Sequence, residues 1–359
     1  ARQSKSQPTA KSQPVKAEES PKKAVTPDLS DLPPEKESPK KEKTAAPDND
    51  FELAPMEEEE KKEGGGAFQS EDWRKQKDKP EHQVQYLEGY SEDYAGGING
   101  VTVSPDGRWG ATAGSSAIQL WDITEGKELG VLKGHVQDIH AVTIAPQGNV
   151  IASAGADGTV RAWDVASMTE VRRLVGHGDA VLSVAFMPDG RYLASAGRDA
   201  TIRVWDVASG QAVRCLEHSE CVYALAVSPL GKYALLGGGG DGYSSDWTIR
   251  MLDLTTGQEV RSLTGHGGIV RGIAISPDGM RAVSVGDDQL LRMWDLYQGA
   301  ELVTIEGHGA PVRCAAFSHN GKYILTGGED KILRLWDAGS GQPLRVYEGH
   351  YGPITSVAF

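Results

Sequence analysis

The sequence predicts an all-β protein built from one repeated unit, and three observations support this. A Gly-His pair returns at steps of 42 residues, from His135 to His177 and again from His266 to His308. A Trp-Asp pair follows each of these histidines at one constant interval, as Trp163-Asp164 follows His135. Between the two marks lie short runs of alternating apolar residues separated by turns, with no helical periodicity. A period of about 40 to 45 residues with these marks predicts a β-propeller with one four-stranded sheet per unit.

The unit from His177 to Asp206 shows how one sheet is expected to form. Val181–Phe186 alternates as a strand that packs on both faces would. Pro188-Asp189-Gly190 ends it, because proline presets φ and glycine accepts a positive φ in a tight turn. Further strands are expected at 191–196, 201–206 and 212–216, and similar Pro-x-Gly turns recur in other units.

On these residues the chain resembles the WD40 repeat family, over roughly 275 of its 359 residues. The resemblance implies a buried tetrad in each unit: a His before the first strand, a Ser or Thr on the second, an Asp in the next turn and a Trp on the third. Four units match, and the three intervals measured from the His are the same in all of them. The expected tetrads are His135, Ser153, Asp157, Trp163; His177, Ser195, Asp199, Trp205; His266, Ser284, Asp288, Trp294; and His308, Thr326, Asp330, Trp336.

Two units depart from this pattern. The first has Tyr90 in the His position and Ser115 or Ser116 in the Asp position, although Thr112 and Trp121 are retained. The fourth keeps His218 and an aspartate, Asp246, but Leu236 replaces the hydroxyl and Leu252 the Trp. The stretch from Leu236 to Asp246 is also longer than the corresponding stretch of the matching units. The fourth unit therefore has the longest turn and should be the least tightly held.

The count of units is expected to exceed six. Val84–Gly89 resembles the fourth strand at Val171–Gly176, and in the family such a segment latches the ring as the outermost strand of the last blade. Ile354–Phe359 resembles a first strand. We therefore expect seven blades with the seventh incomplete in this chain, and a polypeptide that continues beyond Phe359, because an open ring exposes strand edges. A ring of six blades is the alternative.

The composition divides the chain near residue 80. Residues 1–80 hold 10 of the 18 prolines, 3 of the 44 glycines, 16 basic and 18 acidic residues. Such a segment buries too little apolar surface to order itself, so we expect a disordered tail or linker, with the propeller at 81–359. A tail phosphorylated at Ser20, Thr26 or Ser38, each followed by proline, is the alternative.

The propeller region has 21 basic and 32 acidic residues, which disfavours a nucleic-acid partner. No apolar run reaches the length of about 20 residues that spans a membrane. The three cysteines, Cys215, Cys221 and Cys314, have no metal-ligand spacing. A cytoplasmic location is expected, although the chain starts at Ala1 rather than Met.

Recurring Ser, His and Asp residues raise the question of a hydrolase. An enzyme needs one exposed site, whereas this set occurs four times with identical offsets and with a Trp that has no catalytic duty. Gly237, Gly239 and Gly242 spell G-x-G-x-x-G, but a strand rather than a helix follows them. We therefore expect no enzyme activity, no cofactor and no metal site. An arginine stands two residues before the Trp position of five units, which predicts a repeated ion pair at Arg161, Arg203, Arg250, Arg292 and Arg334.

The resemblance places partner binding on the face with the His and Asp loops. It implicates side chains three and five residues after the His and just before the turn Asp, to which we add two aromatic residues of the long turn. The predicted contacts are Asp138, His140, Leu182, Arg198, Tyr223, Tyr243, Trp247, Arg271, Asp287, Arg313 and Glu329. The expected function is a non-catalytic scaffold for a protein or peptide partner. The alternative is a regulatory propeller of a larger protein whose kinase or protease domain lies outside this chain.

Overall fold

The computed structural model describes residues 97–240 and 246–359, which all fall within one compact region, Met56–Phe359. These residues form 24 strands and no helix, so the all-β prediction is confirmed. The expected tail at 1–80, the latch strand at 84–89, Tyr90 and Tyr243 lie outside the described residues.

The strands form six antiparallel sheets, here called blades, whose four strands are hydrogen-bonded in chain order. The innermost strands are β1 (Ile98–Val103), β5 (Ile139–Ile144), β9 (Val181–Phe186), β13 (Val222–Val227), β17 (Val270–Ile275) and β21 (Val312–Phe317). The second strands are β2 (Trp109–Gly114), β6 (Val150–Gly155), β10 (Tyr192–Gly197), β14 (Tyr233–Gly238), β18 (Arg281–Gly286) and β22 (Tyr323–Gly328). The third strands are β3 (Ala117–Asp122), β7 (Thr159–Asp164), β11 (Thr201–Asp206), β15 (Ile249–Asp253), β19 (Leu291–Asp295) and β23 (Leu333–Asp337). The outermost strands are β4 (Lys127–Lys133), β8 (Thr169–Val175), β12 (Gln211–Glu217), β16 (Glu259–Leu263), β20 (Ala300–Ile305) and β24 (Pro343–Tyr347).

The turn chemistry of the third blade explains how adjacent strands are joined. Gly190 has a φ of 66°, which a residue with a Cβ adopts only at a cost. The Asp189 side chain accepts hydrogen bonds from the backbone N–H groups of Arg191 and Tyr192, at 2.9 and 3.2 Å. The turn therefore returns the chain antiparallel immediately after β9, as the Pro-Asp-Gly motif predicts.

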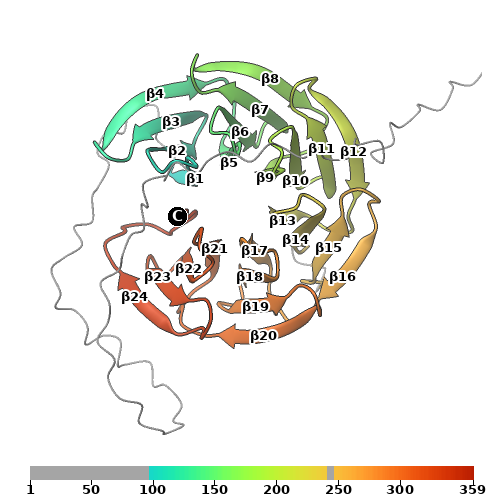
Figure 1. Cartoon of the computed structure of the whole chain (residues 1–359), viewed down its shortest axis with the longest axis vertical. Coiled ribbons are helices and arrows are strands. Elements are labelled where there is room, and N and C mark those ends of the chain that lie inside the picture. The colour runs from blue at the N-terminus through green and yellow to red at the C-terminus, as the bar shows by residue number, and fades with distance from the viewer. Residues whose placement is uncertain (1–96, 241–245) are drawn as a thin grey trace, which may run out of the picture. The chain divides into compact units, whose positions relative to one another are not determined.

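The blades are arranged around a central axis, with the first strand of each nearest to it (Figure 1). Five buried apolar clusters lie between consecutive blades, from the first pair to the fifth and sixth. In the first of these clusters Trp163 of the second blade packs with Ile118 and Leu132 of the first. Each blade is thus held mainly by the apolar faces of its neighbours, the dominant favourable term in folding.

The prediction that 354–359 forms the first strand of a seventh blade is wrong. The described residues form six blades, and there is no strand at 354–359. The segment nevertheless lies between the last and first blades (Figure 1). Ile354 N–H donates to Gly328 O at 2.9 Å, and Val101 N–H donates to Ser356 Oγ at 3.1 Å. A strand is defined by a backbone ladder with a neighbour, and these isolated bonds do not make one.

Candidate functional site at the centre of the propeller

In four blades the structure joins the expected His, hydroxyl, Asp and Trp by hydrogen bonds. In the third blade His177 Nδ1 lies 2.9 Å from Asp199 Oδ2, and His177 Nε2 lies 2.7 Å from Ser195 Oγ. Trp205 Nε1–H donates to the same Oγ at 2.8 Å. The second, fifth and sixth blades repeat this geometry, with all distances between 2.7 and 2.9 Å. Each polar group therefore has a partner although it is removed from water.

The tetrads are closed to solvent. The four histidine side chains are 0–2% exposed. Burial lowers the pKa of His135 and His177, although Asp157 and Asp199 oppose the effect. Burial and nearby Arg334 lower the pKa of His308 to about 4. The hydroxyls of Ser153, Ser195, Ser284 and Thr326 are fully buried, so no tetrad presents a nucleophile to a substrate.

The first and fourth blades, which lack the complete tetrad, pair their polar groups differently. In the first blade Trp121 Nε1–H donates to Thr112 Oγ1 at 2.9 Å. In the fourth blade Leu236 and Leu252 are buried in one apolar cluster. The hydroxyl acceptor and the indole donor are absent together, so neither group is left buried without its hydrogen-bond partner. His218 Nε2 is buried without a hydrogen-bond partner in the described part of the chain. Asp246 pairs with Arg250 at 2.6 Å.

The repeated arginine makes ion pairs in four of the five units. Arg161, Arg250 and Arg292 each contact a glutamate nine residues later, at 2.6 to 2.7 Å. In the sixth blade Pro343 occupies that position, and Arg334 pairs with Asp330 instead. In the third blade Ala212 occupies it, and Arg203 Nε is buried without a partner among the described residues. The four paired arginines therefore belong to the blade framework.

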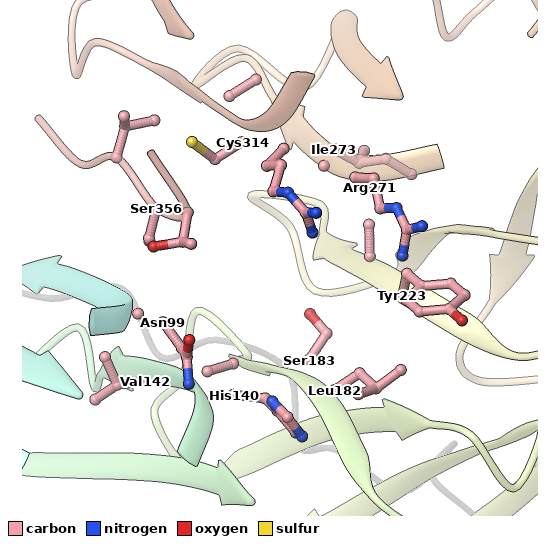
Figure 2. A pocket seen from close by; sticks show the side chains of 18 residues that line it. Asn99, His140, Val142, Leu182, Ser183, Tyr223, Arg271, Ile273, Cys314 and Ser356 are labelled. Atoms are coloured by element: carbon pink, nitrogen blue, oxygen red, sulfur yellow. The ribbon is translucent and has the colours of Figure 1, made fainter. Parts of the chain in front are cut away.

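A β-bulge at the second residue of every innermost strand positions the candidate site. The pairing register skips one residue in each of these strands, at Asn99, His140, Leu182, Tyr223, Arg271 and Arg313. A bulge leaves its extra residue outside the ladder and re-aims that side chain. All six bulge residues line one cavity of about 170 Å³ on the axis, here called the central cavity, together with Thr355, Ser356 and Val357. Figure 2 shows Asn99 and His140 facing Arg271 and Tyr223 across it.

Both arginines among the bulge residues are held by acidic residues of their own blades. Arg271 Nε and Nη2 donate to the two carboxylate oxygens of Asp287 at 2.9 and 2.7 Å. The Arg271 guanidinium also lies over the Tyr223 ring, 4.6 Å from its centroid. Arg313 Nη2 makes the corresponding bond to Glu329. Asp287 and Glu329, predicted as separate partner contacts, thus orient the arginines of the central cavity.

The predicted contacts Asp138, Arg198 and Trp247 lie outside the lining of the central cavity. Burial and the positive charge of Arg198 lower the pKa of His140, while Asp138 opposes them. Arg198 and Asp138 are themselves exposed and do not line the central cavity. Trp247 is half-buried, and a Cβ added at Gly239 would lie 2.8 Å from its Cδ1, so the ring packs against the base of the long turn. Tyr243 lies outside the described residues.

Counting from the His position missed one member of the bulge set. The stretch from Tyr90 to Thr112 in the first unit is longer than the stretch from His to hydroxyl in the matching units. Counting five residues from Tyr90 therefore reaches residue 95, whereas the bulge residue is Asn99. Counting 13 residues back from the hydroxyl, as from Ser153 to His140, finds Asn99. Thr355 and Ser356 also went unrecognised, because their segment was assigned to a strand of another blade.

Every second strand ends at a glycine, and in five of the six blades the backbone just before the innermost strand lies close against that glycine. In the third blade a Cβ at Gly197 would collide with the backbone carbonyl oxygen of Ala180, which immediately precedes β9. We expect Gly197→Ala to lower the free energy of unfolding by about 1–3 kcal/mol, because backbone must move to admit the methyl group. Urea unfolding monitored by circular dichroism measures this. Gly309→Ala is the control, since its Cβ would have nothing within 4 Å, and equal losses for the two variants would contradict the explanation.

The comparison with known families accords with this geometry. The WD40 family, described as WD domain, G-beta repeat, matches residues 82–122, 126–164, 168–206, 257–295 and 299–337. These ranges together cover more than half of the chain. The chain belongs to the WD40 repeat family. The unmatched residues 207–256 contain most of the WD40 blade in which Leu236 and Leu252 replace the hydroxyl and the Trp. No curated protein is similar enough to the chain to count as a match.

Residues 97–240 and 246–359 contain no group of three or more His, Cys, Asp or Glu side chains placed to hold a metal ion. Within the same residues no helix is suited to cross a membrane. No disulfide bond joins Cys215, Cys221 and Cys314, which all lie within the described residues.

Proposed function

We propose that this WD40 protein is a non-catalytic scaffold that binds a protein or peptide partner at the mouth of the central cavity. The observation that carries the proposal is the convergence of the six bulge residues, one from each blade, on a single cavity. Because each bulge lies at the start of an innermost strand, the cavity mouth adjoins the loops that carry the His and Asp residues.

The chemistry of this surface favours a polypeptide. Arginine and tyrosine are the residue types that contribute most often to the energy of protein interfaces, and Arg271 and Tyr223 stack here. The ion pairs of Arg271 and Arg313 hold both side chains in place, which reduces the entropy lost on binding. Acidic Asp138, Asp287 and Glu329 lie among the basic residues, and this mixture of signs disfavours a phosphate polymer.

The proposal predicts that charge reversal on this face abolishes partner binding. We expect the variant Arg198→Glu, Arg271→Glu, Arg313→Glu to lose partners that the unaltered protein recovers, as measured by quantitative mass spectrometry of affinity-purified complexes. The loss should exceed roughly tenfold, since truncating anchors of this kind commonly costs about 2 kcal/mol or more.

The chain offers a matched control on the opposite face. Arg108, Lys232 and Lys322 occupy equivalent exposed positions in the turns between first and second strands, at the other end of the blades. Their triple replacement by Glu changes the net charge equally and should leave binding unchanged. Arg198→Glu alone breaks no ion pair among the described residues, so it tests the face in a protein whose fold is unaltered. Equal partner recovery by both triple variants would contradict the proposal.

A further inference from the structure

We propose that the central cavity binds the side-chain carboxylate of an aspartate or glutamate that the polypeptide partner inserts along the axis. The inference rests on the proposed function and names the chemical group that the partner contributes. Its starting point is the charge of the lining, which is opposite to that of the surrounding domain.

The lining of the central cavity is cationic. Among the described residues that line it, Arg271 and Arg313 carry charge and there is no Asp or Glu. Cys314 adds no negative charge, because burial raises the pKa of its thiol to about 12. Residues 81–359, by contrast, have 21 basic and 32 acidic residues, a difference of −11. Two guanidinium groups in the lining, with no carboxylate among the lining residues, favour an anion at that place.

Both arginines keep donors for a ligand. Asp287 accepts hydrogen bonds from Nε and Nη2 of Arg271, and Tyr223 also bonds to this guanidinium, so that part of its five N–H donors is left for a ligand. Glu329 occupies Nη2 of Arg313, while Arg313 Nε is buried with no partner among the described residues. A buried donor without a partner carries a desolvation cost that a carboxylate would remove. Arginine is suited to this because its fork of N–H groups matches a planar carboxylate.

Two hydroxyl groups add neutral donors around the same space. Ser183 Oγ accepts a hydrogen bond from Leu225 N–H at 3.2 Å, and Ser356 Oγ accepts one from Val101 N–H at 3.1 Å. Each oxygen is thus fixed by a backbone donor. Its own hydrogen is left for a further acceptor, because a hydroxyl both donates and accepts. The lining therefore offers mainly donors, as an anion requires.

The size of the cavity limits what enters it. About 170 Å³ is room for roughly six waters at about 30 Å³ each, and it is below the range of about 300–1,000 Å³ typical of small-molecule sites. One acidic side chain fits this volume. A phosphorylated side chain is less suited, because its charge of about −1.5 to −2 meets the nearby carboxylates Asp287 and Glu329.

The inference is tested with the full chain immobilised and four peptide libraries that differ only in a fixed central residue: Glu, Gln, Lys or phosphoserine. We expect the Glu library to be retained roughly tenfold more than the Gln library, equivalent to about 1.4 kcal/mol. Arg313→Gln should remove that preference. Glu329→Gln should increase retention of the Glu library several-fold, because it frees the Arg313 guanidinium from its intramolecular acceptor. Since misfolding does not increase binding, this gain separates a ligand site from a structural ion pair.

Arg345→Gln on β24 is the matched control and should bind as the unaltered protein does, since Arg345 is exposed on an outermost strand. Equal retention of the Glu and Gln libraries would overturn the inference, as would unchanged or reduced binding by Glu329→Gln. A phosphoserine library retained above the Glu library would overturn the choice of a carboxylate. Retention of the Gln or Lys library that Arg198→Glu abolishes would show that the face binds peptides by other chemistry, so that the proposed function stands while this inference fails.

Discussion

Acidification from pH 7.5 to pH 4 is expected to lower the free energy of unfolding, by about 3 kcal/mol from His308 alone. The pKa of His308 is about 4 in the folded protein, against an ordinary value of 6.5, because the imidazole is buried and lies near Arg334. Between pH 6.5 and pH 4 the unfolded chain therefore binds a proton at His308, whereas the folded chain does not. Stability is full above this pH and falls as pH approaches 4, and the difference between the two pKa values corresponds to about 3 kcal/mol.

Other groups act in the same direction or at lower pH. The pKa values of His135, His177 and His218 are also lowered, chiefly by burial, and each adds to the loss below pH 6.5. Burial raises the pKa of Asp157, but hydrogen bonds from Thr159 and attraction to His135 outweigh it and hold the pKa at about 2. Its contribution is present above pH 3.8 and is lost below that, so the histidines dominate between pH 6.5 and 4.

Urea unfolding at pH 7.5, 6, 5 and 4, followed by circular dichroism, measures this dependence. His319→Ala should show the same pH dependence as the unaltered protein, because His319 is exposed in the turn after β21 and lies outside every tetrad. An unfolding free energy that is the same at pH 7.5 and pH 4 would show that the tetrad imidazoles accept protons in the folded state, contrary to the geometry.

Ser195→Ala is expected to lower the free energy of unfolding by about 2–5 kcal/mol. One hydroxyl serves two partners, since it accepts from Trp205 Nε1 and contacts His177 Nε2. Its removal leaves both groups buried without a partner, at about 1–3 kcal/mol each. The fourth blade shows the alternative, in which Leu236 and Leu252 together replace a hydrogen-bonded pair by apolar contact.

The control for this prediction is Ser219→Ala, an exposed serine in the loop before β13, for which a change below about 0.5 kcal/mol is expected. Chemical unfolding at pH 7.5 measures both variants. If Ser195→Ala cost no more than the control, the tetrad would not contribute to holding the third blade.

The tetrads were predictable from sequence because each uses fixed offsets within one unit, and hydrogen bonds between neighbouring strands preserve those offsets. The approach of His140, Leu182, Tyr223, Arg271 and Arg313 to one cavity also followed from their common offset after the His position. Asn99 did not, because four extra residues in the first unit shift the count. The pairs Arg271–Asp287 and Arg313–Glu329 were not predictable, since a bulge decides which way the arginine turns.

The seventh-blade prediction was wrong for a different physical reason. Alternating residues in Ile354–Phe359 show only that the segment suits a strand, whereas a strand exists when a second backbone pairs with it. The segment instead lies beside β1 and makes contacts through Thr355 and Ser356 side chains. Local pattern therefore identified where the segment would lie but not how it would be bonded.

Under the proposed function, the bulges would allow a change of specificity without a change of fold. A residue that takes no part in the ladder is free of the demands of strand pairing, and in this one chain the position holds Asn, His, Leu, Tyr and Arg at the same place in the pairing register. The proposed function implies that mutations there alter what the protein recognises, while the apolar contacts between blades persist. In that proposal the residues that give the molecule durability lie apart from those that give it selectivity.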